Sequence, residues 1–498
     1  MIPRYEDKEI VILSSQEERL KRFDDVEIAA IRGEEKAGRI MAGLADKLEV
    51  ALKASPPDEV RRKEIENINK HDVMAYVMQR WEVLAKTPKL MAIFHKGKTS
   101  LDIQDNADQL GLLAVISIIE KRLIEFMGVV KKQSIKYWNV YLLARTHGQG
   151  VHVTRFGKRL ASYLADLKQA LDFLRYAKGK ARYGKLSGIV GDYRNTPPEV
   201  EEYALAELEL EPYIGATQIL PRVIHAILAS SIAVICGVLA KVADDFQLMA
   251  RSPNPLIQEP FSEEQIGSSA DPAKRNTINA ENTVGMFRLS LGNLVALFQN
   301  LMTKEERDIA QSSVERVALI DDLHIVMKAL QNMIYIIDKM VVYPDRMLKE
   351  IEDMRGADSA EAAKEFLVTE GLKVGLTRED AYNIVKQAAH MVVQPDELER
   401  DLRVKIPESD AEALANYKRF MQRDKTVIKC NVRDIIATAS LMAVSTTKTA
   451  AGTIAGWNRS LLMIFRDTMT LARWNKIFEP SLVNMEIIRE KIVDIDIV

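Results

Sequence analysis

The sequence is short of cysteine and has almost no excess of either charge. Two cysteines in 498 residues, Cys236 and Cys430, exclude a disulfide framework and favour the reducing cytoplasm. The 69 Lys and Arg residues nearly balance the 71 Asp and Glu residues, and the net charge of −2 gives no electrostatic reason to expect nucleic acid or an anionic membrane as a partner. The first ten residues, MIPRYEDKEI, lack the apolar core of a signal peptide. We therefore expect a cytoplasmic protein that binds neither nucleic acid nor a membrane.

Motifs for metal ions and nucleotide cofactors are also missing. The seven histidines form neither an HExxH motif nor a zinc-type spacing with cysteine. No Walker loop occurs, and no GxGxxG follows a strand-like segment. We expect the protein to use no metal ion and no cofactor.

Glycine and proline are scarce and clustered, and long segments with helical spacing of apolar residues lie between the clusters. Five segments of about 20 residues or more carry this spacing: 108–138, 156–181, 223–250, 283–302 and 322–342. Alternating, strand-like runs are rare. The pattern predicts an all-α protein built around a long-helix bundle. The apolar surface of such a bundle also predicts association into an oligomer.

One segment is apolar enough for two interpretations. Residues 223–240 contain no Lys, Arg, Asp or Glu, and about 18 such residues can just span a bilayer. The segment carries His225 and two serines, and the KVADDF that follows forms no aromatic belt. We favour a helix buried at the centre of the bundle over a membrane span.

The chain divides into three expected helical domains. The N-terminal domain covers residues 1–108, the central long-helix bundle covers residues 109–344, and an extended C-terminal domain covers residues 345–498. The central domain contains a polar loop at 262–282, which interrupts the helical pattern.

Four further polar clusters interrupt that pattern. They are NKHDVMAY (69–76), GKTSLDIQDN (97–106), ARTHGQ (144–149) and EERDIAQSSVER (305–316). We expect Thr99 and Ser100 just ahead of a long helix, and His147 before a glycine at the end of another. Ser312 and Arg316, four residues apart, would share a helix face. Taken singly, each cluster also fits an ordinary solvated helix end or surface.

The stretch GSSADPAKRNTINAEN (267–282) is more specific. Asn276 or Thr277 is suited to cap the helix that follows, and a helix start offers free N–H groups to an anion. Lys274 adds a full positive charge beside it. A substrate carboxylate held there would be stabilised while a carbanion forms next to it. A serine of the loop could serve as the base if the same positive groups stabilise its alkoxide. The alternative is a solvated connector.

This loop resembles the signature of the fumarase/aspartase superfamily, which reads roughly G-S-S-x-M-P-x-K-x-N. Other motifs resemble those of the adenylosuccinate lyase family, in the same order along residues 1–390: IPRY at 2–5, KHDV at 70–73, TSLDIQDNA at 99–107, RTHGQ at 145–149, KLSGIVGDY at 185–193, TQ at 217–218 and RDIAQSSVER at 307–316. The resemblance implies a lyase of purine biosynthesis that eliminates fumarate from adenylosuccinate, giving AMP, and from the succinyl-aminoimidazole carboxamide ribotide. It also implies a homotetramer whose active sites each draw on three subunits.

The resemblance further implies roles for individual residues. Ser268 is the expected base that removes the Cβ proton of the succinyl group, with Ser269 as the less favoured alternative. His147 is the expected general acid that protonates the departing nitrogen. Glu281 is expected to hold and polarise the imidazole of His147. His71 resembles a second histidine that binds and orients the substrate.

The remaining residues implied by the resemblance contact the substrate. Those expected at the dicarboxylate are Thr99, Ser100, Gln218, Lys274 and Asn276, those expected at the nucleotide phosphate are Arg4, Tyr5, Arg307, Ser312 and Arg316, and further expected contacts are Lys70, Asp72, Thr146 and Ser269. Arginines with a hydroxyl are chemically suited to a phosphate group.

The sequence departs from the family pattern at three notable positions. Asp271 stands where the loop normally has Met, Thr277 where it has Pro, and Gln311 where the last motif has His. Threonine should weaken the helix start modestly, because proline fits that position well. Asp271 is the more serious change, because its carboxylate would repel a dianionic succinyl group unless it points to solvent or pairs with a cation.

Two alternative functions stay open at this point. The chain could be another lyase or cycloisomerase of the superfamily that acts on a non-nucleotide dicarboxylate, which the phosphate-type residues disfavour. It could also be a catalytically silent helical bundle with a structural or binding role. Asp271 is the best support for that alternative, and the presence of the expected catalytic residues disfavours it.

Overall fold

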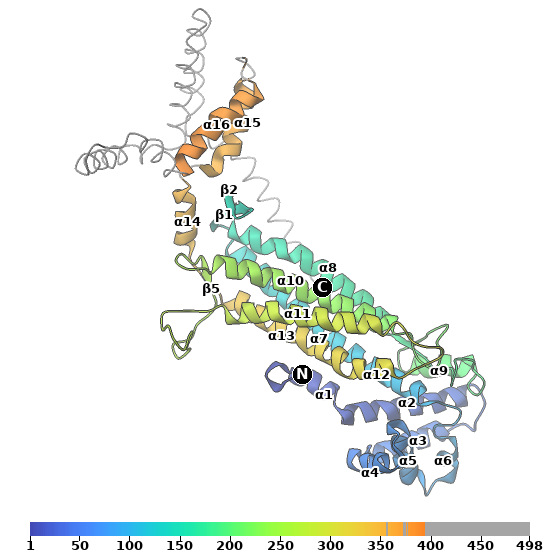
Figure 1. Cartoon of the computed structure of the whole chain (residues 1–498). Coiled ribbons are helices and arrows are strands. Elements are labelled where there is room, and N and C mark those ends of the chain that lie inside the picture. The colour runs from blue at the N-terminus through green and yellow to red at the C-terminus, as the bar shows by residue number, and fades with distance from the viewer. Residues whose placement is uncertain (355–356, 372–374, 376, 394–498) are drawn as a thin grey trace, which may run out of the picture.

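Five long helices form an elongated bundle in the computed structural model, which describes residues 1–354, 357–371, 375 and 377–393 (Figure 1). They are α7 (Ser100–Lys136), α8 (Phe156–Lys180), α10 (Val223–Met249), α11 (Ile278–Gln299) and α13 (Ile320–Lys339). Each overlaps one of the five segments predicted from apolar spacing, so the predicted all-α fold class is confirmed. Helix α7 begins eight residues before the predicted start of its segment, because Thr99 and Asp102 define its first turn.

Most of the shorter elements occupy the two ends of the bundle. Helix α1 (Lys8–Leu13) lies along the side of the bundle, where Glu9 approaches Arg122 of α7 at 3.5 Å. At the end where α7 begins lie α2 (Gln16–Lys36), α3 (Leu44–Ala54), α4 (Glu59–Asn69), α5 (Asp72–Leu84), α6 (Pro88–Ile93), α9 (Pro198–Glu207), α12 (Ala310–Val314), the π turn η2 (Glu315–Leu319), and the paired strands β3 (Tyr183–Gly184) and β4 (Glu211–Pro212). At the other end lie the hairpin of β1 (Tyr141–Thr146) and β2 (Gln149–Arg155), the pair β5 (Ile257–Gln258) and β6 (Val341–Val342), and α14 (Pro344–Asp353), η3 (Ala357–Ser359), α15 (Ala360–Gly371) and α16 (Arg378–Val393).

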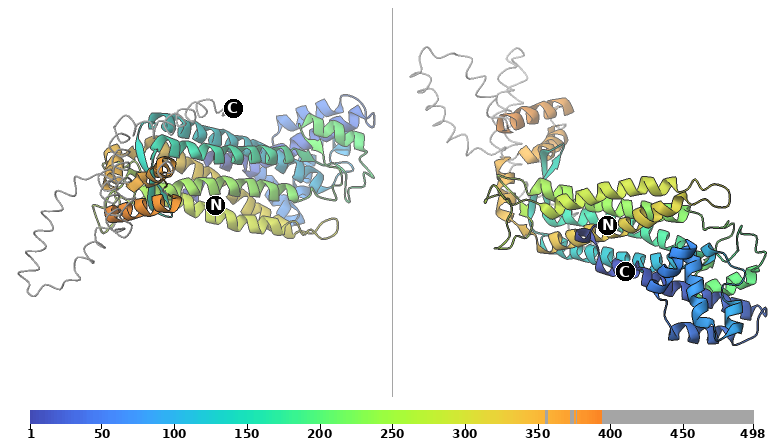
Figure 2. Two further views of the ribbon diagram at one scale, coloured as in Figure 1. Left: turned by 90° about the horizontal axis from the view of Figure 1, so that it is seen from above. Right: turned by 60° about the horizontal axis from the view of Figure 1, so that its bottom comes forward.

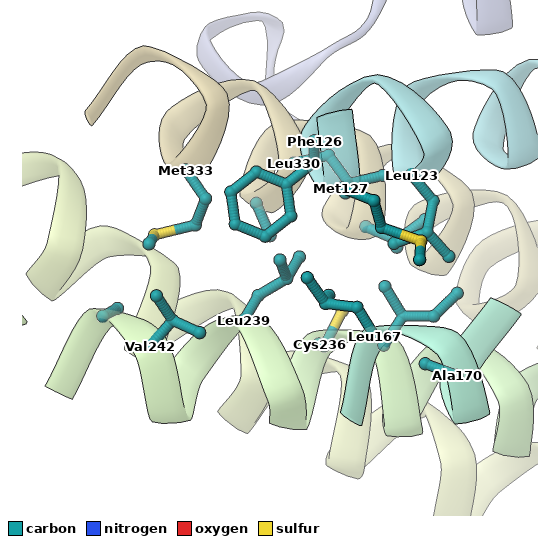
Figure 3. Close-up of a cluster of buried hydrophobic side chains, with 14 of the residues drawn as sticks. Leu123, Phe126, Met127, Leu167, Ala170, Cys236, Leu239, Val242, Leu330 and Met333 are labelled. Atoms are coloured by element: carbon teal, nitrogen blue, oxygen red, sulfur yellow. The ribbon is translucent and has the colours of Figure 1, made fainter. Parts of the chain in front are cut away.

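Helix α10 lies at the centre of the bundle, packed against α8, α11 and α13. Its side chains Cys236, Leu239 and Val242 meet Phe126 of α7 and Leu167 of α8 in a continuous apolar layer (Figure 3). In the described part of the chain, α10 is the one helix long and apolar enough to span a membrane, and 67% of its most apolar window is buried inside the bundle. This packing is what the buried-helix interpretation of residues 223–240 predicts.

The helices before α7 enclose a second apolar core. The ring of Phe23 meets the ring of Tyr76 edge-on, with centroids 5.1 Å apart, and Phe94 and Ile103 pack onto the same cluster. Ile103 belongs to α7, so this core includes the first turns of the longest helix. The expected domain boundary at residues 108 and 109 therefore falls inside α7 without a break in the chain, and the three-domain division stays a prediction. Most of the expected C-terminal domain, from residue 394 onward, lies outside the described residues.

A carboxylate is buried where α10, α11 and α13 meet. Asp322 is 0% exposed, and neither of its carboxylate oxygens has a hydrogen-bond partner within the described residues. Burial raises the pKa of Asp322 to about 7, although Ser290 and Asn293 of α11 lie near enough to oppose the shift slightly. The native chain therefore holds a proton on Asp322 more tightly than the unfolded chain does.

Replacing Asp322 by asparagine should make the protein more stable above neutral pH. Because the native pKa lies above the unfolded value, the stability that the bound proton provides is present below about pH 4 and is lost as the pH rises to about 7. The full loss amounts to about 4 kcal/mol. Asp322→Asn should therefore raise the thermal midpoint at pH 8 by several degrees, and by much less at pH 5. The same change at Asp172, which pairs with Lys168 on the surface of α8, is the control. Equal midpoints for Asp322→Asn and the unchanged protein at pH 8 would contradict this account.

Candidate active site

The residues expected to form one active site lie at opposite ends of the bundle. The α7-end group comprises Lys70, His71, Asp72, Thr99, Ser100, Gln218, Arg307, Ser312 and Arg316, and the loop-end group comprises Thr146, His147, Ser268, Ser269, Lys274, Asn276 and Glu281. Helix α10, which runs between the two ends, has 27 residues and is about 40 Å long. Both views of Figure 2 show the same separation. A single chain therefore does not bring Ser268 and His71 together.

Arg4 and Tyr5 belong to neither group. They form the 3₁₀ turn η1 (Pro3–Tyr5), which lies against α13 along the length of the bundle. Tyr5 packs onto the bundle core, whereas Arg4 is exposed. The guanidinium of Arg4 is thus available on the outside of the bundle.

His71 is the residue that caps α5. Its Nδ1 accepts the backbone N–H of Met74 at 3.3 Å, and the preceding Lys70 adopts a left-handed backbone with φ of 58°. A ring nitrogen that accepts cannot carry the proton, so this tautomer has its proton on Nε2. His71 is exposed and therefore presents an N–H donor to solvent. That donor could bind a carboxylate or carbonyl oxygen of a ligand.

A buried ion pair holds the start of α7 to the segment that follows β3. Asp102 accepts the backbone N–H of Thr99 at 2.9 Å and pairs with the ammonium group of Lys185, and both charged side chains are fully buried. Asn106 donates to the carbonyl of Lys185 and accepts its backbone N–H at 2.9 Å. These bonds set the position of Thr99 and Ser100 relative to the loop that contains residues 186–193.

A second buried network joins α7, α10 and the π turn η2. Arg222 pairs with Asp105 at 3.2 Å and with Glu315 at 2.7 Å, and His225 approaches Glu315 at 3.3 Å. Burial disfavours the charge on Arg222, but the two carboxylates outweigh it and raise the pKa of Arg222. Asp105 also accepts the backbone N–H of Leu220 at 2.8 Å. The network therefore fixes both the chain that carries Gln218 and the turn that carries Arg316.

Three of the five residues expected at the phosphate, Arg307, Ser312 and Arg316, lie near this framework, whereas Arg4 and Tyr5 do not. Arg307 donates to the amide oxygen of Gln218 at 3.0 Å, and Arg316 lies 3.6 Å from the carboxylate of Asp72. Ser312, Arg316 and Asp72 line one pocket of about 370 Å³. The predicted sharing of one regular helix face by Ser312 and Arg316 needs correction, because α12 ends at Val314 and a π turn follows. A π turn contains about one residue more than an α-helical turn, and both side chains nevertheless line the same pocket.

His147 lies at the tip of a β-hairpin, not at the end of a helix as predicted. Thr146 pairs with Gln149, and the two residues between them, His147 and Gly148, have φ of 52° and 77°. Two positive φ angles are what a type I′ turn requires, and histidine tolerates them better than most residues. The strands form because Leu142 and Leu143 are buried there. The hairpin holds the exposed imidazole of His147 away from the bundle.

In the polar loop, two backbone N–H groups point at the side chain of Ser268. The N–H groups of Ala270 and Asp271 donate to Ser268 Oγ at 3.2 and 3.1 Å. Donors in this position stabilise negative charge on the oxygen, as an alkoxide base needs. The exposed Ser269 has no such donors in the described structure. The geometry thus favours Ser268 over Ser269 as a base.

The start of α11 differs from its prediction. Glu259, a buried residue 20 positions earlier, accepts the N–H groups of Asn279 at 3.3 Å and Ala280 at 2.9 Å. The side chains of Asn276 and Thr277 therefore do not cap the helix, and two of the N–H groups expected to receive a substrate carboxylate are already occupied. A carboxylate takes this place because the helix dipole and free N–H groups attract it. Burial raises the pKa of Glu259, and these hydrogen bonds oppose the rise.

The other polar residues of the loop bond locally. The amide of Asn276 donates to the carbonyl of Gly267 at 2.9 Å, and the hydroxyl of Thr277 donates to Glu281 at 3.2 Å. Asp271 is exposed and accepts the backbone N–H of Ala273 at 3.0 Å. Lys274 is exposed and forms no ion pair with another described residue. Arg275, the other cation of the loop, lies over the ring of Phe261 with its Cζ 5.1 Å from the centroid. Lys274 has no such contact in the described structure and is therefore available to an anion.

Several residues that build the site were not predicted. Asp102 and Lys185 lie within recognised motifs, but nothing in their spacing indicates that they pair, and Arg222 and Glu259 lie outside the motifs. Within the described residues, no group of three or more His, Cys, Asp or Glu side chains could hold a metal ion.

Known proteins resemble this chain in both sequence and structure. The lyase family matches residues 8–290. Adenylosuccinate lyase of Aquifex aeolicus is 33% identical over 409 residues, which cover 82% of this chain and 92% of that protein. Adenylosuccinate lyase of Thermotoga maritima is 32% identical over 78% of this chain and 88% of that protein.

Two solved structures share the fold. The fumarate lyase of Mesorhizobium sp. BNC1 superposes with a TM-score of 0.70 at 20% identity, covering 81% of this chain and 91% of that one. The 3-carboxy-cis,cis-muconate lactonizing enzyme of Pseudomonas putida superposes with a TM-score of 0.69 at 23% identity, covering 82% and 90%. Together with the sequence relatives and the motifs on the two ends of the bundle, these matches show that the chain belongs to the lyase family that includes the adenylosuccinate lyases.

Proposed function

We propose that the protein is a fumarate-releasing carbon–nitrogen lyase that cleaves adenylosuccinate to AMP and fumarate, and also cleaves the succinyl-aminoimidazole carboxamide ribotide of purine biosynthesis. The observation that carries the proposal is the pairing of two complementary groups of residues on one chain. The loop-end group contains a base and an acid, and the α7-end group contains donors for a carboxylate and a phosphate. The relatives named adenylosuccinate lyase support this substrate.

A complete site requires more than one copy of the chain, because the two groups lie at opposite ends of a bundle whose helix α10 is about 40 Å long. Helix α11 leaves Leu289, Leu291, Val295 and Phe298 exposed between 41% and 60%, which is unusual for large apolar side chains on one helix. Covering this face with an antiparallel copy of the bundle would bring the loop end of one chain to the α7 end of another. We therefore propose a homotetramer with shared active sites, located in the cytoplasm.

The reaction would begin at Ser268. With its alkoxide stabilised by two backbone N–H groups, Ser268 removes a proton from Cβ of the succinyl group. Lys274 stabilises the negative charge that moves onto the neighbouring carboxylate. The Cα–N bond then breaks, the carbon–carbon double bond of fumarate forms, and His147 donates a proton to the departing nitrogen. His71 binds the substrate through the N–H of Nε2.

The alternative of a cycloisomerase acting on a dicarboxylate without a nucleotide has less support. Its basis is a likeness at 23% identity, which concerns the fold alone. The guanidinium of Arg316 and the hydroxyl of Ser312 on one pocket favour a phosphorylated substrate.

Purified protein should release fumarate from adenylosuccinate, with AMP formed in equal amount. Fumarate can be followed with a coupled enzyme and AMP by chromatography. A protein that binds adenylosuccinate but releases no fumarate would contradict the proposed activity and favour the catalytically silent alternative.

Ser268→Ala and His147→Ala should each lower kcat by at least about 10²–10⁴-fold while leaving substrate binding largely intact, because each removes a proton-transfer group. Isothermal titration with adenylosuccinate measures the binding, and the fumarate assay measures kcat. Ser262→Ala is the matched control, because this exposed serine of the same loop has no expected contact with the substrate. A rate near that of the unchanged protein for either variant would exclude the role assigned to that residue.

Mixing two inactive variants should restore activity if the site is shared. Ser268→Ala and His71→Ala alter opposite ends of the bundle, so random reassembly would leave roughly a quarter of the sites with both residues. Ser268→Ala mixed with Lys274→Ala should restore nothing, because both changes lie on the same loop. Equal recovery in the two mixtures, or none in the first, would argue against sites formed by different subunits.

A further inference from the structure

The pocket that contains Ser312 and Arg316 extends inward beyond any residue assigned so far. Its inner wall is formed by Arg19 and Arg22 of α2, Gly111 and Val115 of α7, and Leu323 of α13. These helices come together at the α7 end of the bundle (Figure 1). The pocket has room for a small polar group, and its mouth belongs to the candidate active site.

The acidic side chains on the pocket wall are engaged by cations other than Arg22. Arg19 takes both oxygens of Asp108, at 2.8 and 3.2 Å. Glu66 pairs with Arg62 at 2.9 Å, Glu315 pairs with Arg222 at 2.7 Å, and Asp72 lies 3.6 Å from Arg316. Asp108 is thus engaged on both oxygens by Arg19, and Arg22 forms no ion pair with it in the described structure.

Arg22 is consequently a cation without a carboxylate partner among the described residues. Its Nη2 donates to the carbonyl of Leu13 at 3.0 Å, and its Nε is buried with no hydrogen-bond acceptor. Burial lowers the pKa of Arg22, and the charge of Asp108 opposes that shift. A buried N–H without an acceptor is costly, and an anion entering the pocket would satisfy it.

Gly111 makes the position of Arg22 possible. A Cβ atom added at residue 111 would lie 2.9 Å from Nη2 and 3.0 Å from Cζ of Arg22, closer than such atoms approach. Glycine is unfavourable inside a helix such as α7, where alanine would be preferred by about 1 kcal/mol. The glycine thus leaves space for the guanidinium at a cost to the helix.

We propose that this inner pocket binds the phosphate group of the nucleotide substrate, and that Arg22 is a binding residue for it alongside Ser312 and Arg316. The inference rests on the proposed function for the identity of the substrate. The chemistry requires an oxyanion with several acceptors, because the guanidinium of Arg22 and the hydroxyl of Ser312 both donate hydrogen bonds. A phosphate monoester meets this requirement, and free inorganic phosphate shares its chemistry.

Arg22→Met, which keeps the length and packing of the side chain, tests the proposal. We expect KM for adenylosuccinate to rise roughly 10- to 100-fold with little change in kcat, as for the loss of a charge-assisted hydrogen bond. KM for the dephosphorylated nucleoside of the same substrate should stay unchanged. Lys21→Met is the matched control, because Lys21 is the neighbouring cation on α2 and pairs on the surface with Glu17 and Glu18.

Gly111→Ala is a second variant that leaves Arg22 in the sequence but displaces its guanidinium. It should raise KM for the nucleotide and not for the nucleoside, without lowering the thermal midpoint. Equal losses on both substrates, or no change on either, would overturn the assignment of Arg22 to the phosphate.

Inorganic phosphate provides a readout that needs no turnover. It should raise the thermal midpoint of the unchanged protein and of Lys21→Met, and raise that of Arg22→Met much less. If the unchanged protein released no fumarate, the proposed function would fail while this measurement still tested the pocket. A phosphate-dependent shift that Arg22→Met retains in full would overturn the inference. A shift that the variant loses while KM for the nucleotide stays unchanged would instead mean that free phosphate binds here as an effector and that the substrate does not.

Discussion

The uncharged stretch of α10 is the constraint on which the arrangement of the molecule depends. Eighteen consecutive residues without a charged side chain must be withdrawn from water, and a single helix can bury them only if other helices surround it. Helices α8, α11 and α13 pack directly against α10, and α7 contributes side chains to the same apolar core. A bundle built around such long helices carries its connections at two distant ends. The polar clusters that interrupt the helical pattern lie at those ends, so most of the candidate functional groups are divided between them.

The apolar core does not by itself position the functional groups at the α7 end. Buried charges do so: Asp102 with Lys185, and Arg222 with Asp105 and Glu315. Removing one member of such a pair leaves an uncompensated charge in the interior, which costs far more than the loss of an exposed pair. These networks join segments that lie 83 to 117 positions apart in the sequence. They therefore hold the residues around Thr99 and Gln218 as one unit.

The pairing of charged side chains also determines where an anion can bind. The start of α11 was expected to be an anion site, but Glu259 occupies its free N–H groups. At the opposite end of the molecule, the acidic side chains on the inner pocket wall pair with arginines other than Arg22, and Arg22 has no carboxylate partner among the described residues. Anion binding is consequently assigned to side-chain cations such as Lys274 and Arg22. This division fits a substrate with a dicarboxylate at one end and a phosphate at the other.

The sequence by itself determined the class of fold and the identity of most candidate residues. Apolar spacing is a local property, so the five long helices and the burial of α10 could be predicted, and short motifs indicated Ser268, His147 and the arginines. The tertiary structure decided the rest. It placed His147 on a hairpin, because strand pairing depends on neighbours that the local pattern does not contain. It supplied the cap of α11 from Glu259, and it brought Arg22 of α2 into contact with Gly111 of α7. Each of these depends on contacts between distant segments, and such contacts cannot be predicted from the spacing of residues along one segment.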